Sequence, residues 1–520
     1  CTQRNVRTVA ASSCRAVGGE SRPGPLADRW QSVDAFPHRT AIHPSPRCSA
    51  TAPVPVSPSG STSNLCIRAQ WRPQRGREGD HGARPPPAST RRHRPIPVPD
   101  IHSPTSRDST PSAFRPPFAR RPSSPRAMTA GSNGAANGMN GHKTVCIVGV
   151  AGFIGSHLLE KIIREKDWHV VGIDMVAPSK IQQLLGAEKK WAARFEFHQM
   201  DVTTKEGVEC MREQIKRSDT VINLAAICNP SEYIKQPVNT INSNFTDAQD
   251  CINFCVEFNK HLIHFSTCEV YGRTLSSYGL DAADPKNYIL DEETTPMIMG
   301  AVSAQRWCYA CAKQLVERLI YAHGTQNGLK FTIVRPYNWI GPRMDYIPGV
   351  DGKDDGQPRV LASFMTALMK GDPLVLVNGG EVFRTFCYVD DACDAVVRIV
   401  ERPEKSQGRC FNVGNPDNNI RISDLAELMI DMYSKITGKP KGTTVKISGE
   451  EYYGAGYEDS DLRIPSMSLV NKQLDWSPKT TLKEAMESTM RVFIDKYADK
   501  LANKKRSADE AAPAIKAAKV

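Results

Sequence analysis

Residues 144–155 read Thr-Val-Cys-Ile-Val-Gly-Val-Ala-Gly-Phe-Ile-Gly, an apolar run followed by glycines at 149, 152 and 155. A continuous apolar run of this length is typical of a strand covered on both faces of a parallel sheet. The glycine spacing predicts a tight turn into a helix, where backbone approaches a bound pyrophosphate and the helix N-terminus attracts negative charge. The stretch therefore predicts the opening strand, turn and helix of a dinucleotide-binding domain.

Strands and helices alternate after this motif, which predicts an α/β fold with a doubly wound parallel Rossmann sheet and a ligand crevice at the strands' carboxyl ends. A helix is predicted at 152–165, and the predicted strands are 144–149, 169–174, 195–200, 219–225, 261–266 and 330–335. Beyond residue 336 the pattern loosens into loops and helices, typical of a smaller substrate-binding lobe. The helices of this part are predicted at 359–370, 421–437 and 481–497, while 390–402 and 410–413 return to the sheet.

These patterns divide the chain into four parts. We expect a low-complexity, disordered segment at 1–142, a Rossmann domain at 143–335 to which 386–413 return, a lobe at 336–500 and a flexible tail at 501–520.

The chain's positive charge is concentrated in its first quarter. Residues 1–127 contain 21 of the 37 prolines, 20 arginines, no lysine and only 7 acidic residues, whereas the whole chain carries +11. The remainder is close to neutral, so the overall charge does not indicate a nucleic-acid partner. Three interpretations of residues 1–127 stay open: a solvated disordered tail, a plastid-type transit peptide, or translated upstream sequence. We favour Met128 as the physiological start.

Cysteine spacing and hydropathy indicate the kind of cellular compartment in which the protein acts. The fifteen cysteines show no framework spacing, which favours a reducing compartment such as the cytoplasm, with a plastid expected only if residues 1–127 are a transit peptide. No apolar run approaches the roughly 20 residues needed to cross a bilayer, and no metal site is expected. The pair Cys308-x-x-Cys311 is interpreted as incidental core thiols.

Acidic residues after the second and third predicted strands bear on the choice of cofactor. Asp174 ends the second strand, where a carboxylate accepts hydrogen bonds from the adenosine ribose hydroxyls and repels a 2′-phosphate, so we expect NAD rather than NADP. Asp201 follows the third strand and is expected either near the adenine or as a turn or N-cap carboxylate. The predicted NAD-binding residues are Gly149, Gly152, Phe153, Ile154, Gly155, Asp174, Asp201, Tyr309 and Lys313.

A Tyr309-x-x-x-Lys313 pair lies on one face of a predicted helix. An ammonium group beside a phenol lowers the phenol's pKa from its unperturbed ~10, which would make Tyr309 a general base for removing a hydroxyl proton as hydride leaves carbon. Ser266-Thr267-Cys268-Glu269 ends the fifth strand and brings a hydroxyl, a thiol and a carboxylate to the mouth of the sheet. Arg306 shares the helical face of Tyr309 and is expected to meet a substrate carboxylate or phosphate.

Several longer stretches resemble the extended short-chain dehydrogenase/reductases that act on nucleotide sugars. The similarity is to the group that decarboxylates UDP-glucuronate to UDP-apiose and UDP-xylose, and more distantly to the bacterial decarboxylase domain that makes 4-keto-arabinose. It covers about residues 143–500 and is carried by residues 223–230 (NLAAICNP), 264–272 (HFSTCEVYG), 305–313 (QRWCYACAK), 334–345 (VRPYNWIGPRMD) and 452–463 (YYGAGYEDSDLR).

The resemblance implies roles for individual residues. Tyr309 would take the C4 hydroxyl proton as hydride passes to NAD, with Lys313 tuning it and Thr267 holding the hydroxyl. The resulting 4-ketone allows carbon dioxide to leave, and the residues near this step would be Glu269 and Arg463, supported by Asp459. The substrate UDP-glucuronate would be held by Asn338, Arg343, Arg359, Arg384 and Tyr457.

Two cysteines distinguish the outcome of the reaction. The resemblance implies that Cys228 and Cys268 relay protons during opening and re-closure of the sugar ring, giving UDP-apiose beside UDP-xylose while NAD is regenerated. A thiol pKa modestly below ~8.5 would suit this work near neutrality. The alternatives are a decarboxylase that forms UDP-xylose only, a 4-epimerase, and a non-catalytic dinucleotide-binding scaffold or redox sensor. The resemblance also implies a homodimer, and we expect neither a nucleic-acid nor a membrane partner.

Overall fold

The computed structural model describes residues 142–179, 193–281, 283–348, 350, 358–454 and 458–517. The segment predicted to be disordered or absent from the mature protein was 1–142, and its residues 1–141 lie outside the described residues, as does Tyr457.

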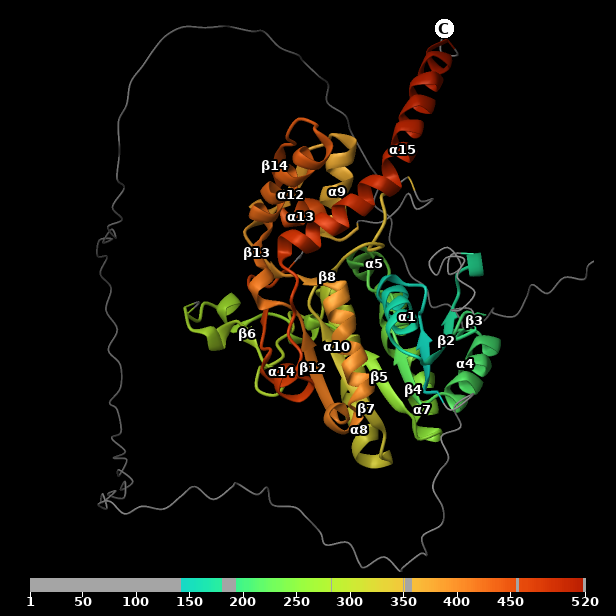
Figure 1. Ribbon diagram of the computed structural model, residues 1–520. Helices are drawn as coiled ribbons and strands as arrows, with labels where there is room; N and C mark the ends of the chain where they lie inside the picture. Colours follow the sequence, from blue (N-terminus) through green and yellow to red (C-terminus); the bar gives the residue numbers. More distant parts are fainter. Residues whose placement is uncertain are drawn as a thin grey trace, which may run out of the picture. The chain divides into compact units, whose positions relative to one another are not determined.

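A seven-stranded parallel sheet forms the centre of the described chain, with the order β12-β7-β5-β4-β1-β2-β3 (Figure 1). Every pairing between neighbours is parallel; for example, Val145 pairs with Val170 of β2 and with Thr220 of β4. The predicted α/β fold with a doubly wound parallel sheet is confirmed, and the six predicted strands begin and end within two residues of the observed ones. The strands are β1 (Thr144–Val148), β2 (His169–Asp174), β3 (Phe195–Gln199), β4 (Thr220–Asn223), β5 (His261–Phe265), β7 (Lys330–Pro336) and β12 (Arg409–Val413).

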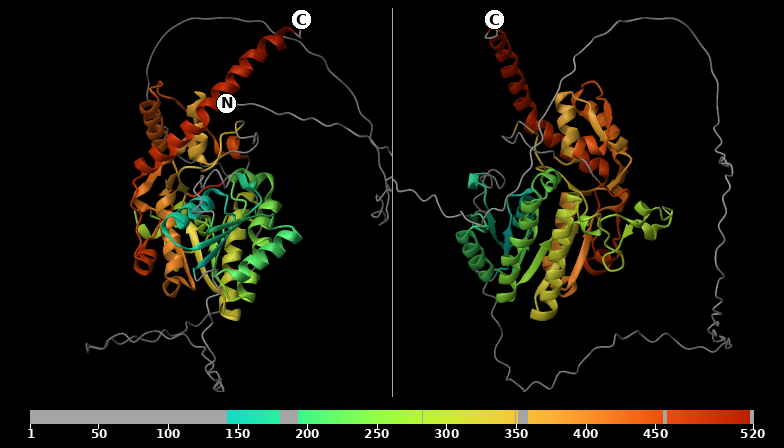
Figure 2. Two further views of the ribbon diagram at one scale, coloured as in Figure 1. Left: turned by 45° about the vertical axis from the view of Figure 1, so that its right-hand side comes forward. Right: turned by 180° about the vertical axis from the view of Figure 1, so that it is seen from behind.

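Helices cover both faces of the sheet because successive side chains of each strand point to opposite sides. In β1, Val145 and Ile147 pack into one core, and Cys146 and Val148 into another. The two helical layers are visible in the views of Figure 2. The layer that packs on Val145 and Ile147 contains α1 (Phe153–Glu165), α10 (Val389–Glu401) and α14 (Ser468–Leu474). The layer that packs on Cys146 and Val148 contains α4 (Lys205–Arg217), α7 (Ala248–Glu257) and α8 (Cys308–Asn327).

The strand order reverses beside β1, where β2 lies on one side and β4 on the other. Ligands of open α/β sheets bind at such a reversal, outside the strands' carboxyl ends. The loop after β4 leads into α5 (Pro230–Lys235), α6 (Pro237–Ile241) and the π-helical turn η2 (Asn242–Thr246).

A separate hydrophobic core, called the second core below, lies beyond the carboxyl ends of the strands. Its centre is formed by α9, α12 and α15 together with the strand β9. α11 (Pro403–Ser406) packs against α10 and α14 beside the sheet. The other elements that follow β7 are β8 (Trp339–Ile340), α9 (Val360–Lys370), β9 (Leu374–Val377), η7 (Asn378–Gly380), β10 (Phe383–Thr385), β11 (Cys387–Tyr388), η8 (Pro416–Asn418), β13 (Asn419–Arg421), α12 (Ile422–Thr437), β14 (Thr444–Ile447), α13 (Gly449–Tyr453), β15 (Ile464–Pro465) and α15 (Leu482–Ala517).

One region differs from the sequence-based expectation, and another is a region for which the sequence predicted no elements. The helix predicted at 481–497 continues to Ala517, so most of the segment expected as a flexible tail belongs to α15. Between β5 and α8 the chain makes an excursion that contains little regular structure. Its elements are η3 (Cys268–Tyr271), η4 (Leu275–Tyr278), η5 (Pro285–Asn287), β6 (Ile289–Leu290) and η6 (Gln305–Trp307).

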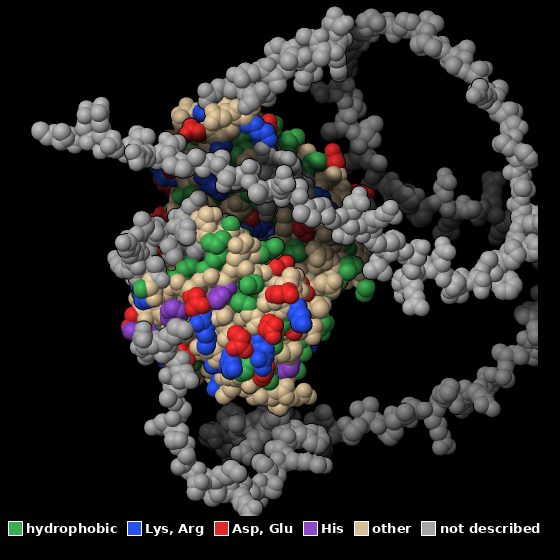
Figure 3. Space-filling view, turned by 90° about the vertical axis from the view of Figure 1, so that its right-hand side faces the viewer, with side chains coloured by type: hydrophobic (Ala, Val, Ile, Leu, Met, Phe, Trp, Pro, Cys, Tyr) green, Lys and Arg blue, Asp and Glu red, His purple; other side chains and the backbone are tan. Residues whose placement is uncertain are grey.

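The surface over β3 and α4 carries basic and acidic side chains side by side (Figure 3). Arg212 pairs with Glu257 and Glu213, and Arg217 pairs with Glu196 at 2.6 Å. Among the described residues, no helix is both long and apolar enough to cross a membrane.

Candidate active site

The glycine turn between β1 and α1 has the geometry of a dinucleotide cradle. Gly149 has a φ of +86°, which side chains disfavour, and a Cβ atom there would lie 3.0 Å from the Ala225 nitrogen. At Gly155 a Cβ atom would lie 2.3 Å from the Gly149 carbonyl oxygen, so only glycine lets α1 approach the turn this closely. Gly152 begins α1 without a side-chain cap, which leaves the first N–H groups of the helix for an anion.

The two predicted cofactor carboxylates are both engaged by backbone. Asp174 accepts from the Ala151 N–H at 2.9 Å and from the Val176 N–H at 3.3 Å, so it fixes the glycine turn against the end of β2. Asp201 accepts from both the N–H and the hydroxyl of Thr203, at 2.9 and 2.8 Å, as a turn carboxylate does. The turn alternative for Asp201 therefore describes its observed contacts, while a contact with adenine stays a prediction.

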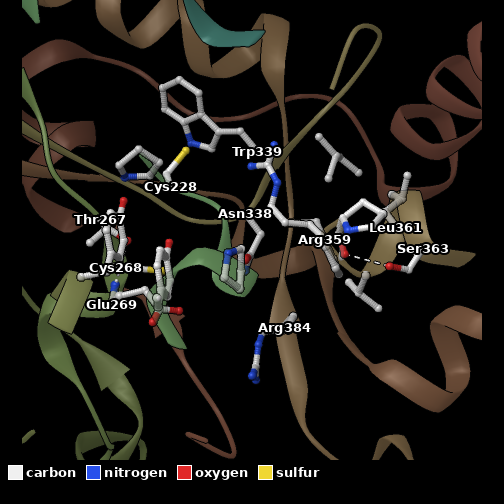
Figure 4. A pocket seen from close by; sticks show the side chains of 18 of the residues that line it. Cys228, Thr267, Cys268, Glu269, Asn338, Trp339, Arg359, Leu361, Ser363 and Arg384 are labelled. Carbon is white, nitrogen blue, oxygen red and sulfur yellow. Dashed lines mark hydrogen bonds between the residues drawn. The ribbon is translucent and has the colours of Figure 1, made fainter. Parts of the chain in front are cut away.

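A cavity of about 360 Å³ lies where β4, β5 and β7 end and the second core begins. Figure 4 shows Cys228 and the Thr267–Glu269 stretch on one side and Arg359, Leu361 and Ser363 on the other. All nine residues predicted to be catalytic line it: Cys228, Thr267, Cys268, Glu269, Arg306, Tyr309, Lys313, Asp459 and Arg463.

The residues predicted to bind cofactor or substrate are divided. Phe153 and Ile154 line the cavity, as do Asn338, Arg359 and Arg384. The cavity is not lined by six of the predicted residues, namely Gly149, Gly152, Gly155, Asp174, Asp201 and Arg343. Instead, Arg343 pairs with Glu160 of α1 at 2.9 Å, and its backbone has a φ of +68°.

Tyr309 and Lys313 are buried in the first turns of α8, as their spacing predicts. The Thr267 side chain lies close enough to the Tyr309 phenol to lower its pKa in part, and the Lys313 ammonium donates to the Phe265 carbonyl at 2.9 Å. Burial lowers the pKa of Lys313 to about 8. Burial together with Cys228 and Glu269 raises the pKa of Tyr309 well above 10. The expectation that Lys313 alone makes a phenolate accessible near neutrality was therefore wrong, because desolvation outweighs that ammonium.

An arginine–carboxylate cluster forms one wall of the cavity. Glu269 accepts from Arg306 at 2.6 Å and from Arg463 at 3.2 Å. Asp459 pairs with Arg384 and lies 3.7 Å from Arg463 and 3.9 Å from Arg306. Three guanidinium groups thus face two carboxylates, and this excess of one positive charge is suited to an anionic ligand.

Both carboxylates of the cluster remain ionised. Burial alone would raise the pKa of Glu269, but Arg306 and Arg463 outweigh it and hold that pKa well below its usual range. The pKa of Asp459 is lowered against the same effect of burial, first by Arg384. Arg306 therefore meets Glu269 directly, which the sequence pattern did not indicate.

The two thiols have different surroundings. Cys268 is buried, and its pKa is raised to about 11, mainly by desolvation. The expectation of a lowered pKa was wrong for Cys268, whose thiol is protonated near neutrality and suited to donate a proton. Cys228 is exposed at the cavity. The cysteines of the described ranges are free thiols. Cys308 is buried and donates to the Tyr233 carbonyl at 3.4 Å, whereas Cys311 is exposed, so the interpretation as core thiols was wrong for Cys311.

The opposite end of the cavity joins α1 to the second core. Arg359 pairs with Asp345 at 2.8 Å, and its guanidinium lies 5.9 Å from the centre of the Phe153 ring. Asn338 donates to the Thr385 carbonyl at 2.9 Å.

Tyr233 of α5 was not predicted as a site residue. Its ring stacks on that of Tyr309, with centroids 4.6 Å apart and an interplanar angle of 6°. Both rings line the cavity and are buried. No sequence spacing signals this pair, since α5 and α8 are distant in the chain; only its nearness to Cys228 in sequence pointed toward the site.

The sequence that forms this fold matches a known family of enzymes. Residues 145–414 match the NAD dependent epimerase/dehydratase family, and the chain is a member of that family of enzymes. UDP-D-apiose/UDP-D-xylose synthase 2 of Arabidopsis thaliana is 49% identical over 363 residues, which cover 68% of this chain and 92% of that protein. UDP-D-apiose/UDP-D-xylose synthase of Oryza sativa subsp. japonica is 48% identical over 354 residues, or 67% of this chain and 88% of that protein.

Among solved structures, the PbgP3 protein from Burkholderia pseudomallei is 30% identical, with a TM-score of 0.58 over 69% of this chain and 98% of that chain. The resemblance inferred from the sequence is confirmed.

Proposed function

We propose that this enzyme converts UDP-glucuronate into UDP-apiose and UDP-xylose, with NAD reduced and then reoxidised in each cycle. The observation that carries the proposal is the shared wall of one cavity: a tyrosine–threonine pair, two thiols and the arginine–carboxylate cluster all face it. The two plant relatives, whose names specify these products, support the choice.

The glycine turn would hold the pyrophosphate of NAD, and Asp174, which anchors the turn, would lie beside the adenosine ribose. Bound NAD supplies the acceptor for hydride from C4 and, in its oxidised form, one positive charge. Since the phenol of Tyr309 is neutral without a further positive charge nearby, we expect it to lose its proton only in the complex with NAD.

Within that complex, Tyr309 would take the proton of the C4 hydroxyl, and Thr267 would hold the oxygen as it becomes a ketone. The carboxylate at C6 would face the arginine–carboxylate cluster, whose net positive charge offsets its burial. The bond between C5 and C6 breaks, carbon dioxide leaves, and the remaining electron pair forms an enolate. Cys268, protonated near neutrality, or a water held by Glu269 would then deliver a proton to C5.

Two outcomes follow from the 4-ketone. Return of the hydride to C4 gives UDP-xylose. Alternatively, Cys228 removes the proton of the C2 hydroxyl, the C2–C3 bond breaks, and C2 becomes an aldehyde while C3 and C4 share an enediolate. Bonding of C4 to C2 contracts the ring and leaves an aldehyde at C3, which the hydride reduces to give UDP-apiose.

The test is to incubate the full chain with UDP-glucuronate and catalytic NAD and to identify the products by NMR. UDP-apiose, or its cyclic phosphodiester breakdown product, beside UDP-xylose is the expected result. If UDP-xylose is the only product, the enzyme is a decarboxylase that does not contract the ring. An absence of carbon dioxide release would overturn the proposal. Cys228→Ser and Cys268→Ser should each reduce UDP-apiose more than carbon dioxide, and an unchanged ratio in both would remove the thiols from the mechanism.

We also propose a homodimer that acts in the cytoplasm. Leu315 and Tyr321 of α8 are 49% and 43% exposed, which offers apolar contact area beside the active-site helix. Light scattering of the purified chain should give twice the chain mass, whereas a monomer at micromolar concentration would contradict the dimer.

A further inference from the structure

The loop that carries Cys228 has no regular secondary structure of its own. It connects β4 to α5 over residues 224–229, and the thiol is exposed at the cavity. A side chain on such a loop keeps one position only if the neighbouring backbone is held by other groups. The position matters here because Cys228 lies close enough to Tyr309 and Lys313 to influence the pKa of each.

A π-helical turn packs against this loop. The turn, Asn242–Thr246, lies between α6 and α7, and its hydrogen bond runs from the Asp247 N–H to the Asn242 carbonyl at 3.0 Å. Turns of this kind are rare and occur frequently at functional sites.

Two successive side chains of this turn hold one residue of the loop. The Ser243 hydroxyl accepts from the Ile227 N–H at 3.0 Å, and the Asn244 amide donates to the Ile227 carbonyl at 2.8 Å. Ile227 directly precedes Cys228, so both peptide groups of that residue are fixed. Asn244 is fully buried and also donates to the Thr240 carbonyl at 2.8 Å.

The π turn explains how both side chains reach the same residue. In an α-helix, successive side chains point about 100° apart, so two neighbours seldom contact one residue of another segment. A π turn contains more residues per turn, which brings successive side chains closer in direction. The irregularity of the helix and the double contact on Ile227 are therefore parts of one arrangement.

We propose that Ser243 and Asn244 are positioning residues that hold the Cys228 thiol at the sugar ring and thereby set the proportion of ring contraction to direct hydride return. The inference rests on the proposed function for its second half only. Its first half, the fixed position of the thiol, can be measured without any substrate.

The test compares Ser243→Ala with Ser243→Thr in the full chain. Loss of one hydrogen bond on the loop should lower the ratio of UDP-apiose to UDP-xylose about fivefold, while carbon dioxide release changes by less than about twofold. The rate at which iodoacetamide alkylates Cys228, followed at that cysteine by peptide mass spectrometry, should change by a similar factor. Ser243→Thr keeps the hydroxyl and should restore both values.

Thr246→Ala is the matched control, because Thr246 lies in the same turn, is exposed, and bonds only weakly to Asn242 at 3.5 Å. It should leave the alkylation rate and the product ratio unchanged. Asn244→Leu should have a larger effect than Ser243→Ala, and Ser243→Ala decides the question if the leucine variant does not fold.

Different outcomes test the position of the Cys228 thiol and its effect on the product ratio. An unchanged alkylation rate in Ser243→Ala overturns the positioning role. A changed alkylation rate with an unchanged product ratio overturns the link between the thiol position and the ring contraction, and with it the role of Cys228 in the proposed function.

Discussion

Glu269→Gln removes one negative charge from the arginine–carboxylate cluster while preserving the size of the side chain. In the structure the two carboxylate oxygens accept separately from Arg306, at 2.6 Å, and from Arg463, at 3.2 Å. A glutamine keeps one acceptor oxygen but places an NH₂ group against the other guanidinium. Because both of these groups are hydrogen-bond donors, one of the two contacts is lost. The cluster is then left with three positive charges and one negative charge.

The expected loss is worked from the burial of the partners. Removing one member of a buried ion pair costs about 3–5 kcal/mol in the free energy of unfolding. Because the Glu269 side chain is 22% exposed while that of Arg463 is only 4% exposed, we expect the lower end, about 3 kcal/mol. The folded-state pKa of Glu269 is depressed from an ordinary value of 4.5. The difference in free energy of unfolding between the variant and the wild type is therefore largest above about pH 4.5, and it becomes smaller as the pH falls below that value.

Urea unfolding at pH 7 measures this difference, and Glu381→Gln is its control. Glu381 pairs with Arg421 at 3.5 Å but is 66% exposed, so the same chemical change there should cost less than about 0.5 kcal/mol. In activity, Glu269→Gln should lower the KM for UDP-glucuronate, because the added net positive charge favours its carboxylate, and lower kcat by about 10²-fold or more. A stability loss equal to that of Glu381→Gln would refute the reasoning that this carboxylate balances the arginines.

Three further expectations follow from the same geometry. Tyr309→Phe should abolish NADH formation on addition of UDP-glucuronate and leave NAD binding, measured by calorimetry, within about threefold; undiminished turnover would remove Tyr309 as the base. Since the pKa of Lys313 is about 8, kcat should fall as pH rises through that value and the ammonium loses its proton, and the fall should move to higher pH in Lys313→Arg. Gly155→Ala should destabilise the fold because its Cβ would lie 2.3 Å from the backbone. In Gly152→Ala the Cβ would lie 3.4 Å from the nearest atom, so this variant should keep its melting temperature and lose NAD affinity. An equal loss of stability in both variants would contradict the steric explanation.

The sheet was predictable because its strands carry a local signal. The apolar run of β1 and the glycines after it depend on neighbours in sequence, and the observed strand and helix differ from expectation by one residue. The C-terminal end of α15 was not predicted, because a charged, alanine-rich stretch is compatible with either a helix or a disordered segment.

Many of the residues that line the cavity could be named from the sequence, but their burial and pKa values could not. The residues that reach the cavity come from motifs that resemble a known family, but the resemblance does not report burial. Desolvation raises the pKa of Tyr309 and of Cys268, and it depends on packing from segments far away in sequence. The stack of Tyr233 on Tyr309 and the bonds from η2 to Ile227 are likewise contacts across the fold, which no local pattern encodes.

The arginine–carboxylate cluster has a consequence for how this site can diversify. Its five charges come from η3, η6, β10 and the segment before β15, and each carboxylate is shared by more than one arginine. A single charge change at any of these positions disturbs all of the others. If the proposed acidic substrate is correct, a descendant enzyme that accepts an uncharged sugar would therefore need coordinated substitutions in at least two distant segments. Each of those substitutions alone would give a less stable protein.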